Sequence, residues 1–335
     1  MSDFVSLGQA AQRVVDRLRT GRPGIMSFPI TNEDEWKSWR RDDVTASVAG
    51  ALFGVHQHTT PYELFYIKRG DIPDPEETPA MERGKLLEPV AAYLLRKERP
   101  HWKIWAPKTY FRDPTKQIGC TPDLFAIDPE REGFGNIQVK SVEPSIFRKT
   151  WINGDDEIEP PLWIAIQCLI EKELPGAAWT AVAPMRVGHG IDIDLIEIPE
   201  SPGLMQRLEG EVSNFWRNFR QNIVPEPDAG RDGELLSRLY KPNGLCVDLS
   251  RDNRIAELIA DRDRLTAEKK TGDVAAEEIK KINAELLKKL AGASSGQLAD
   301  GRIVTAKHVK RSGYTVGDSE YTLVTVKSPS KRGKK

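Results

Sequence analysis

The alternation of helix-like and strand-like segments constrains the fold of this 335-residue chain more than any other feature. Helical patterns occupy the chain up to residue 97, recur between the third and fourth strand-like segments, and follow the fifth. The strand-like segments are residues 102–111, 118–127, 135–142, 177–184 and 191–198. This order predicts a mixed α/β core, in which helices flank a central mixed sheet.

The composition changes in the C-terminal third. From residue 250 to residue 290, Ala, Glu, Lys, Leu and Arg dominate, and apolar residues recur at helical spacing. Gly272 interrupts this pattern, which predicts a helical hairpin, with one long helix as the alternative. A small β unit should follow, with turns at Asp300-Gly301 and Ser312-Gly313. The expected divisions are a core domain over 1–228, a linker over 229–249, the hairpin over 250–292, the β unit over 293–328 and a basic tail over 329–335.

Composition also narrows the class of protein. No apolar run is long enough to cross a bilayer, so we expect no membrane-spanning helix and no membrane partner. The first residues, Met1 to Phe4, lack the basic and apolar regions of a secretory signal. Three widely spaced cysteines, Cys120, Cys168 and Cys246, indicate a reducing cytoplasm and argue against disulfide bonds. The formal net charge of -1 neither supports nor excludes DNA binding, because the local field of a groove matters more than the sum.

The segments Thr121-Pro122-Asp123 and Gln138-Val139-Lys140 carry the most informative side chains. Side chains alternate along a strand, so Gln138 and Lys140 should point one way while Val139 points into the core. If the Asp123 strand pairs beside this one, two oxygen ligands and an ammonium group converge. Such a group suits a hard divalent cation and the hydrolysis of a phosphodiester. The alternative is three ordinary polar residues at strand ends.

Glu88 is a candidate for a further oxygen ligand. It lies on an expected helix over 82–97, beside Leu87 and Val90, where we expect burial. A carboxylate buried there is costly unless it is paired or bound to a metal. The other interpretation is an exposed glutamate on a helix that Pro89 kinks.

Five separated blocks occur in an order that resembles the YqaJ viral recombinase family. They are Trp36-x-x-x-Arg40-x-x-x-Val44-Thr45-Ala46-Ser47, Gly84-Lys85-x-x-Glu88, Thr121-Pro122-Asp123, Gln138-Val139-Lys140 and Gln167. The resemblance covers residues 30–225, and its strength lies in the order of five individually weak blocks. This family includes lambda-type exonuclease, in the PD-(D/E)xK nuclease superfamily. The resemblance therefore implies a PD-(D/E)xK nuclease-like fold, with the active site at one edge of the sheet.

The resemblance also implies roles for the catalytic residues. Asp123 matches the metal-binding aspartate, Lys140 the catalytic lysine, and Glu88 the acidic residue that completes the metal site. The backbone carbonyl of Val139 is a further expected ligand. Gln138 stands where the family usually has Glu; its amide oxygen is still a ligand, but one negative charge is lost, so we expect weaker binding of divalent ions.

A second set of residues matches the pocket for a terminal 5′-phosphate. Arg40 and Ser47 match residues that hold this phosphate, and Thr121 occupies a position that often has Ser, whose hydroxyl can also donate. Gln167 matches a glutamine on the helix behind the active site, and we group it with the phosphate-binding residues. The family's second glutamine, two positions later, is Leu169 here.

The function that the resemblance implies is a metal-dependent exonuclease, with Mg2+ as cofactor and Mn2+ as a substitute. It would degrade one strand of linear duplex DNA from a 5′-phosphorylated end. Expected partners are double-stranded DNA ends, a single-strand annealing protein (RecT- or Beta-like) and two further copies in a homotrimer, in the cytoplasm of a bacterial host of a phage or prophage. The alternatives are a catalytically weakened DNA-end-binding or adaptor protein of the same fold, and an endonuclease.

Overall fold

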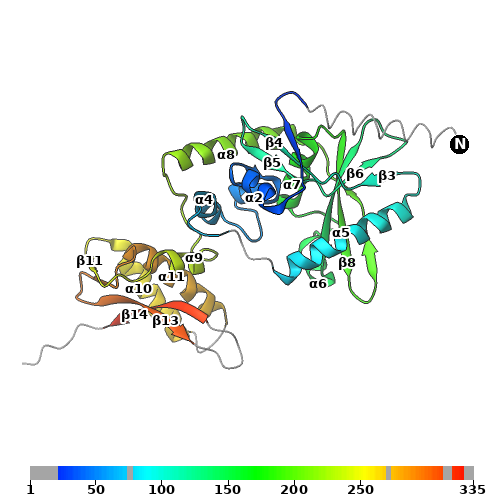
Figure 1. Cartoon of the computed structure of the whole chain (residues 1–335). Coiled ribbons are helices and arrows are strands. Elements are labelled where there is room, and N and C mark those ends of the chain that lie inside the picture. Colours follow the sequence, from blue (N-terminus) through cyan, green and yellow to red (C-terminus); the bar gives the residue numbers. More distant parts are fainter. Residues whose placement is uncertain (1–21, 74–77, 269–272, 312–318, 328–335) are drawn as a thin grey trace, which may run out of the picture. The chain divides into compact units, whose positions relative to one another are not determined.

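The computed structural model describes residues 22–73, 78–268, 273–311 and 319–327 (Figure 1). The chain divides into two compact units, Met1–Val224 and Pro225–Lys335. The finer divisions drawn from the sequence stay predictions. The expected turn at Ser312-Gly313 and the expected basic tail lie outside the described residues.

The larger sheet of the first unit has six strands in the described part of the chain. Their order is β10-β8-β7-β6-β3, with β9 paired to β8. The strands are β3 (Lys103–Trp105), β6 (Leu124–Ile127), β7 (Gly135–Val142), β8 (Trp179–Val187), β9 (Ile191–Ile193) and β10 (Ile196–Glu197). Strands β7 and β8 are parallel and the other pairs antiparallel, so the sheet is mixed.

Helices form layers on both faces of this sheet. On one face, Ala91 and Leu95 of helix α5 (Pro79–Glu98) pack into the same buried cluster as Val139 of β7. On the other, Cys168 of α7 packs into a cluster with Val182 of β8. The predicted fold class, a mixed sheet flanked by helices, is confirmed.

Local sequence signals explain where several helices of this unit begin. The side chains of Asn32, Thr60 and Thr78 accept hydrogen bonds from backbone N–H groups of the first turn. Helix α5 runs through Pro89 without restarting. The helices are α2 (Glu33–Arg41), α3 (Ala46–Ala49), the 3-10 helix η1 (Gly50–Phe53), α4 (Pro61–Arg69), α5 (Pro79–Glu98), α6 (Pro144–Thr150), α7 (Leu162–Glu173) and α8 (Pro202–Arg220).

The sequence predicted residues 102–111 and 118–127 as single strands. In the structure each segment forms two strands, one in the larger sheet and one in a second, smaller sheet. Its order is β1-β4-β5-β2, from β1 (Met26–Pro29), β2 (Val44–Thr45), β4 (Thr109–Asp113) and β5 (Ile118–Cys120). The chain leaves the larger sheet through Pro107 and Lys108, whose φ is 46°, and returns through Pro122. Proline has no N–H to donate to a strand partner, so the ladder breaks at these points.

A buried polar network holds the smaller sheet. The Tyr110 hydroxyl donates to Asp43 Oδ2, and Arg112 Nη2 donates to Asp43 Oδ1, both at 2.8 Å. Asp43 is fully buried, so these charge-assisted bonds offset the cost of removing its carboxylate from water. Gly119 lies against this network, where a Cβ atom would overlap the Tyr110 hydroxyl oxygen.

The second unit contains the expected helical hairpin and small β unit. Helices α10 and α11 pack Leu258, Ile259 and Leu286 into one buried cluster with Val304 and Val324 of the sheet. Helix α9 was not predicted; it lies in the segment expected to be a linker. The elements are α9 (Gly233–Leu239), β11 (Cys246–Asp248), α10 (Asn253–Glu268), α11 (Asp273–Leu290), β12 (Ser295–Gln297), β13 (Ile303–Arg311) and β14 (Ser319–Lys327), with strand order β11-β12-β13-β14.

Replacing Gly119 with alanine should destabilise the first unit by about 1–3 kcal/mol, because the added methyl group has no room beside Tyr110. The matched control is Gly210→Ala at an exposed position of α8, where none of the neighbouring atoms considered lies within 4 Å of the new Cβ. That control should gain up to about 1 kcal/mol. Urea unfolding followed by tryptophan fluorescence measures both, since all eight tryptophans lie in Met1–Val224. Equal stabilities for the two variants would contradict this packing.

Candidate active site

Asp123 lies where the chain passes from the smaller sheet into β6. The antiparallel register pairs Leu124 of β6 with Ile137 of β7, which brings Asp123 beside Gln138. Asp123 Oδ2 accepts the Val139 N–H at 2.9 Å and a Gln138 N–H at 2.6 Å. Strands β6 and β7 both lie inside the sheet order, so Asp123 lies at the end of an interior strand.

The Gln138 amide presents its nitrogen to this site. Nε2 donates to Asp123 Oδ2 and, at 3.2 Å, to the Val139 carbonyl oxygen. A carboxylate and a carbonyl only accept hydrogen bonds, which assigns the amide orientation. The opposite atom, Gln138 Oε1, is buried without a hydrogen-bond partner. The sequence predicted this oxygen as a ligand, whereas the structure turns it away from Asp123.

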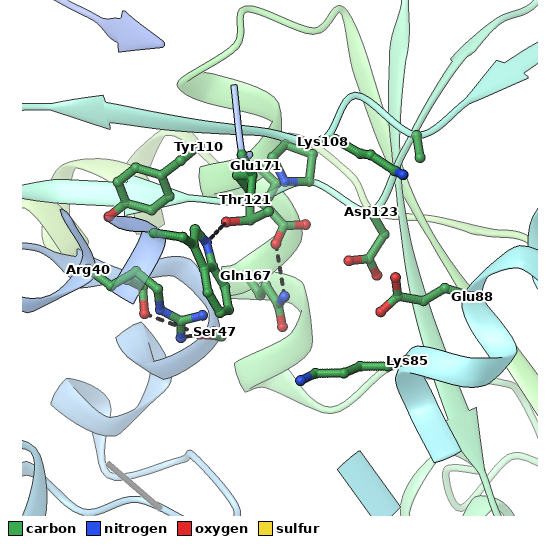
Figure 2. Close-up of a pocket in the computed structure, with 15 residues that line it drawn as sticks. Arg40, Ser47, Lys85, Glu88, Lys108, Tyr110, Thr121, Asp123, Gln167 and Glu171 are labelled. Carbon is green, nitrogen blue, oxygen red and sulfur yellow. Dashed lines mark hydrogen bonds between the residues drawn. The ribbon is translucent and has the colours of Figure 1, made fainter. Parts of the chain in front are cut away.

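Glu88 faces Asp123 from helix α5 (Figure 2). The residue is exposed at the rim of the cavity, so the expected burial of the whole side chain was wrong. Its carboxyl group nevertheless points inward, toward the Asp123 carboxyl group. Desolvation first, and the Asp123 charge second, raise the pKa of Glu88 to about 7. Burial likewise raises the pKa of Asp123, against the lowering effect of Lys140.

Lys140 is held from helix α7 rather than by a carboxylate on its own strand. Its Nζ donates to Gln167 Oε1 at 2.8 Å and lies 5.2 Å from the centre of the Trp163 ring. Gln167 Nε2 in turn donates to Glu171 Oε1 at 2.8 Å. The structure therefore places Gln167 between Lys140 and Glu171, with both ends of its amide engaged.

The residues matched to a phosphate pocket also come together. Arg40 Nη2 lies 3.4 Å from Ser47 Oγ, and its guanidinium carbon lies 4.3 Å from the centre of the Trp36 ring. Trp36 Nε1 donates to Thr121 Oγ1 at 3.0 Å. Trp36 thus connects the arginine to the segment that carries Asp123, and it fixes the orientation of both.

One cavity of about 380 Å³ joins the two groups (Figure 2). Gln138 and Lys140 do not line it, although their partners Asp123 and Gln167 do. The lining residues are Ile30, Trp36, Arg40, Thr45, Ser47, Lys85, Glu88, Ala106, Lys108, Tyr110, Thr121, Pro122, Asp123, Gln167 and Glu171. Acidic and basic side chains therefore line the same cavity. A site that binds both a metal ion and a phosphate needs both kinds of side chain.

Three charged lining residues were missed by sequence reasoning. Lys85 lies one helical turn before Glu88 in the same block, so its spacing could have indicated a shared face. Glu171 lies four residues after Gln167 in an apolar helix, which is a signal for a buried polar pair. Lys108 carries no sequence signal, because its place depends on the chain crossing between two sheets.

The oxygen atoms around Asp123 suit a hard divalent cation. The Gln138 N–H group points at two acceptors, the Asp123 carboxylate and the Val139 carbonyl, and so donates where a cation would be attracted. Across the described part of the chain, no group of three or more His, Cys, Asp and Glu side chains is arranged to hold a metal. At this point of the cavity, Asp123 and Glu88 are the two facing carboxyl groups, and position 138 carries an amide. Turning that amide would supply the orphaned Oε1 as a further oxygen ligand.

Residues 35–171 match the family model of the YqaJ-like viral recombinase domain. Over these residues the chain is similar to that family. The matched segment contains every residue of the cavity's two groups, from Arg40 to Gln167, and the resemblance seen in the sequence is confirmed. The comparison with curated proteins gave no match.

The chain is also similar to solved structures. One is an alkaline exonuclease (LHK-Exo) from Laribacter hongkongensis, at 20% identity and a TM-score of 0.42 over 57% of this chain and 94% of that chain. LHK-Exo in complex with dAMP is similar at 20% identity and a TM-score of 0.43, with the same coverage. Among the described helices, none combines the length and hydropathy needed to cross a membrane.

Without divalent ions, the folded protein should lose stability as the pH rises from 4.5 to about 7. Glu88 gives up its proton near 4.5 when unfolded but near 7 when folded, so the folded state holds more protons in between. Glu88→Gln should therefore flatten this slope, modestly because solvent at the rim screens the charge. Urea unfolding in EDTA across this range measures it, with exposed Glu82→Gln on the same helix as the control. Identical slopes for Glu88→Gln and wild type would refute the shift.

Proposed function

We propose that the chain is a metal-dependent DNA exonuclease. The observation that carries this proposal is the shared cavity, in which the facing carboxyl groups of Asp123 and Glu88 adjoin the Arg40, Ser47 and Thr121 group. Acidic oxygens suit a cation, and a guanidinium with hydroxyl groups suits a phosphate. A phosphodiester bound between them would meet both.

Asp123, Glu88 and the Val139 carbonyl would hold Mg2+, or Mn2+ in its place, with Gln138 Oε1 added after its amide turns. The ion would supply Lewis acidity toward the phosphate and lower the pKa of a water. Asp123 is already fixed for this role, because the Val139 N–H and the Gln138 amide both hold its Oδ2 atom.

Lys140 acts on the charge that develops at the phosphate, or takes a proton from the attacking water. Gln167 Oε1 accepts one of its N–H bonds at 2.8 Å and so restricts where the ammonium group can lie. Trp163 lies beside the same group, 5.2 Å away, and limits its access to bulk water. Both contacts restrict the Lys140 side chain to one conformation.

Arg40, Ser47 and Thr121 would hold a terminal 5′-phosphate. The Trp36 ring keeps the Arg40 guanidinium flat and in place, and such cation–π stacking stabilises an arginine by about 0.5–2 kcal/mol. Lys85 and Lys108 add positive charge at the same cavity. We therefore propose degradation from 5′-phosphorylated ends of linear duplex DNA. A single-strand annealing partner, a homotrimer and the cytoplasm of a bacterial host complete the proposal by analogy with the family.

The second candidate is a DNA-end-binding or adaptor protein with weakened catalysis. The orientation of Gln138 is the observation in its favour, because its amide nitrogen occupies the acceptors that a cation needs. The phosphate-binding group would be unaffected, so such a protein would still bind DNA ends.

A digestion assay separates the candidates. With Mg2+ or Mn2+, wild type should shorten linear 5′-phosphorylated duplex DNA, degrade dephosphorylated DNA more slowly and leave closed circles intact. Lys140→Ala should lower the rate by about 100-fold or more while DNA-end binding persists. Binding without shortening in either metal would support the adaptor, and cut circles would indicate an endonuclease.

Gln138→Glu should lower the Mg2+ concentration for half-maximal digestion by about tenfold or more, because a carboxylate replaces a neutral ligand. It should also destabilise the metal-free protein, since the new carboxylate faces Asp123 at hydrogen-bond distance. The matched control, Gln206→Glu, adds the same charge at an exposed position of α8 that does not line the cavity. Magnesium titrations by activity and by calorimetry measure the effect. Coincident curves for wild type and Gln138→Glu would show that the amide is not a ligand.

A further inference from the structure

Helix α7 carries two buried polar residues one turn apart. Gln167 is 5% exposed and Glu171 is 1% exposed, within the segment Leu162–Glu173 that is otherwise apolar on its buried faces. Residues four apart on a helix lie on the same side, so this pair faces β7 and the cavity together. An apolar pair would pack as well there, so packing alone does not explain them.

Glu171 fixes which end of the Gln167 amide faces Lys140. Its Oε1 atom accepts from Gln167 Nε2 at 2.8 Å, and Lys140 Nζ donates to Gln167 Oε1 at the same distance. A carboxylate accepts and an ammonium only donates, so each end of the amide has one suitable partner. If Glu171 were absent, the amide could turn and present N–H groups to the ammonium.

Among the described residues, no cation is in direct ion-pair contact with buried Glu171, although the Lys140 charge is near enough to lower the pKa of its carboxyl group. Its Oε2 atom accepts from Asn136 Nδ2 at 3.5 Å, and Asn136 also donates to Thr180 Oγ1 at 3.0 Å. A carboxyl group held only by two amides is expensive to keep in a core, and desolvation first, with the Asp123 charge second, raises the pKa of Glu171 to about 8. The contact of Glu171 that reaches the proposed active site is its hydrogen bond with Gln167.

This chain has a particular need for such a contact. Gln138 shares the face of β7 with Lys140, but its amide nitrogen is turned to Asp123. Position 138 therefore offers no carboxylate to hold the lysine. Helix α7 supplies a carboxyl group instead, that of Glu171, which acts on Lys140 through the Gln167 amide between them.

We propose that Glu171 is a positioning residue, which orients the Gln167 amide so that its oxygen holds Lys140 at the site of phosphodiester hydrolysis. The inference rests on the proposed nuclease function for its kinetic consequence. Its structural claim, the relay from Glu171 to Lys140, concerns the metal-free protein and can be tested without catalysis.

Two substitutions at position 171 separate orientation from charge and packing. Glu171→Met keeps the length of the side chain but accepts no hydrogen bond, so kcat should fall by about 10–100-fold with KM for DNA nearly unchanged. Glu171→Gln keeps an oxygen for Gln167 Nε2 and should recover most of the kcat. The control, Glu173→Gln, alters the exposed glutamate on the same helix that pairs with Arg22.

A double-mutant cycle tests whether Glu171 acts through Gln167. If it does, Glu171→Met combined with Gln167→Met should be no slower than Gln167→Met alone. Additive losses would overturn the relay. So would wild-type kcat in Glu171→Met, or a Glu171→Gln variant as slow as Glu171→Met, since the latter would assign the role to charge.

Carbon-13 NMR of lysine-labelled, metal-free protein gives a readout independent of activity. The Lys140 signal, identified by its loss in Lys140→Arg, should differ from those of exposed lysines in wild type and Glu171→Gln. It should move to the exposed-lysine position in Glu171→Met. An unmoved signal in Glu171→Met would overturn the inference. If wild type digests no DNA, the proposed function fails while this spectrum still decides the relay.

Discussion

The two hydrogen bonds that Asp123 Oδ2 accepts from β7 fix the position of the carboxylate on which the proposed chemistry of the cavity depends. The Val139 N–H and the Gln138 amide hold this carboxylate at the point where the chain leaves one sheet and enters the other. The crossing segment also carries Thr121, which Trp36 binds through its indole N–H. Fixing Asp123 therefore fixes both the acidic group and the phosphate-binding group.

The neutral amide at position 138 reduces the repulsion between acidic groups in the cavity, but it also opposes the binding of a cation. Three carboxylates in one partly buried cluster would repel each other strongly without a bound cation. The amide donates to Asp123 instead, and so stabilises the protein in the absence of metal. The same contact must be broken before Gln138 Oε1 can face a cation. The amide therefore stabilises the metal-free protein and lowers its affinity for the metal.

The sequence predicted the position of the site better than its details. Strand alternation predicted Gln138 and Lys140 on one face, whereas pairing with the Asp123 segment was only a condition of the argument, which the register of β6 and β7 meets. The division into two sheets was missed because Pro107 and Pro122 were taken as residues within strands rather than as breaks. Amide orientation and the contact of Glu171 with Gln167 depend on which acceptors lie nearby in space, and local sequence does not contain that information.

The most direct test of this account is a crystal structure of the protein with manganese, using the anomalous signal of the metal. The account predicts a peak between Asp123 and Glu88, with the Gln138 amide turned so that Oε1 faces the ion. A cavity without any anomalous peak, with the Gln138 nitrogen still bound to Asp123 at a manganese concentration that supports digestion, would contradict it.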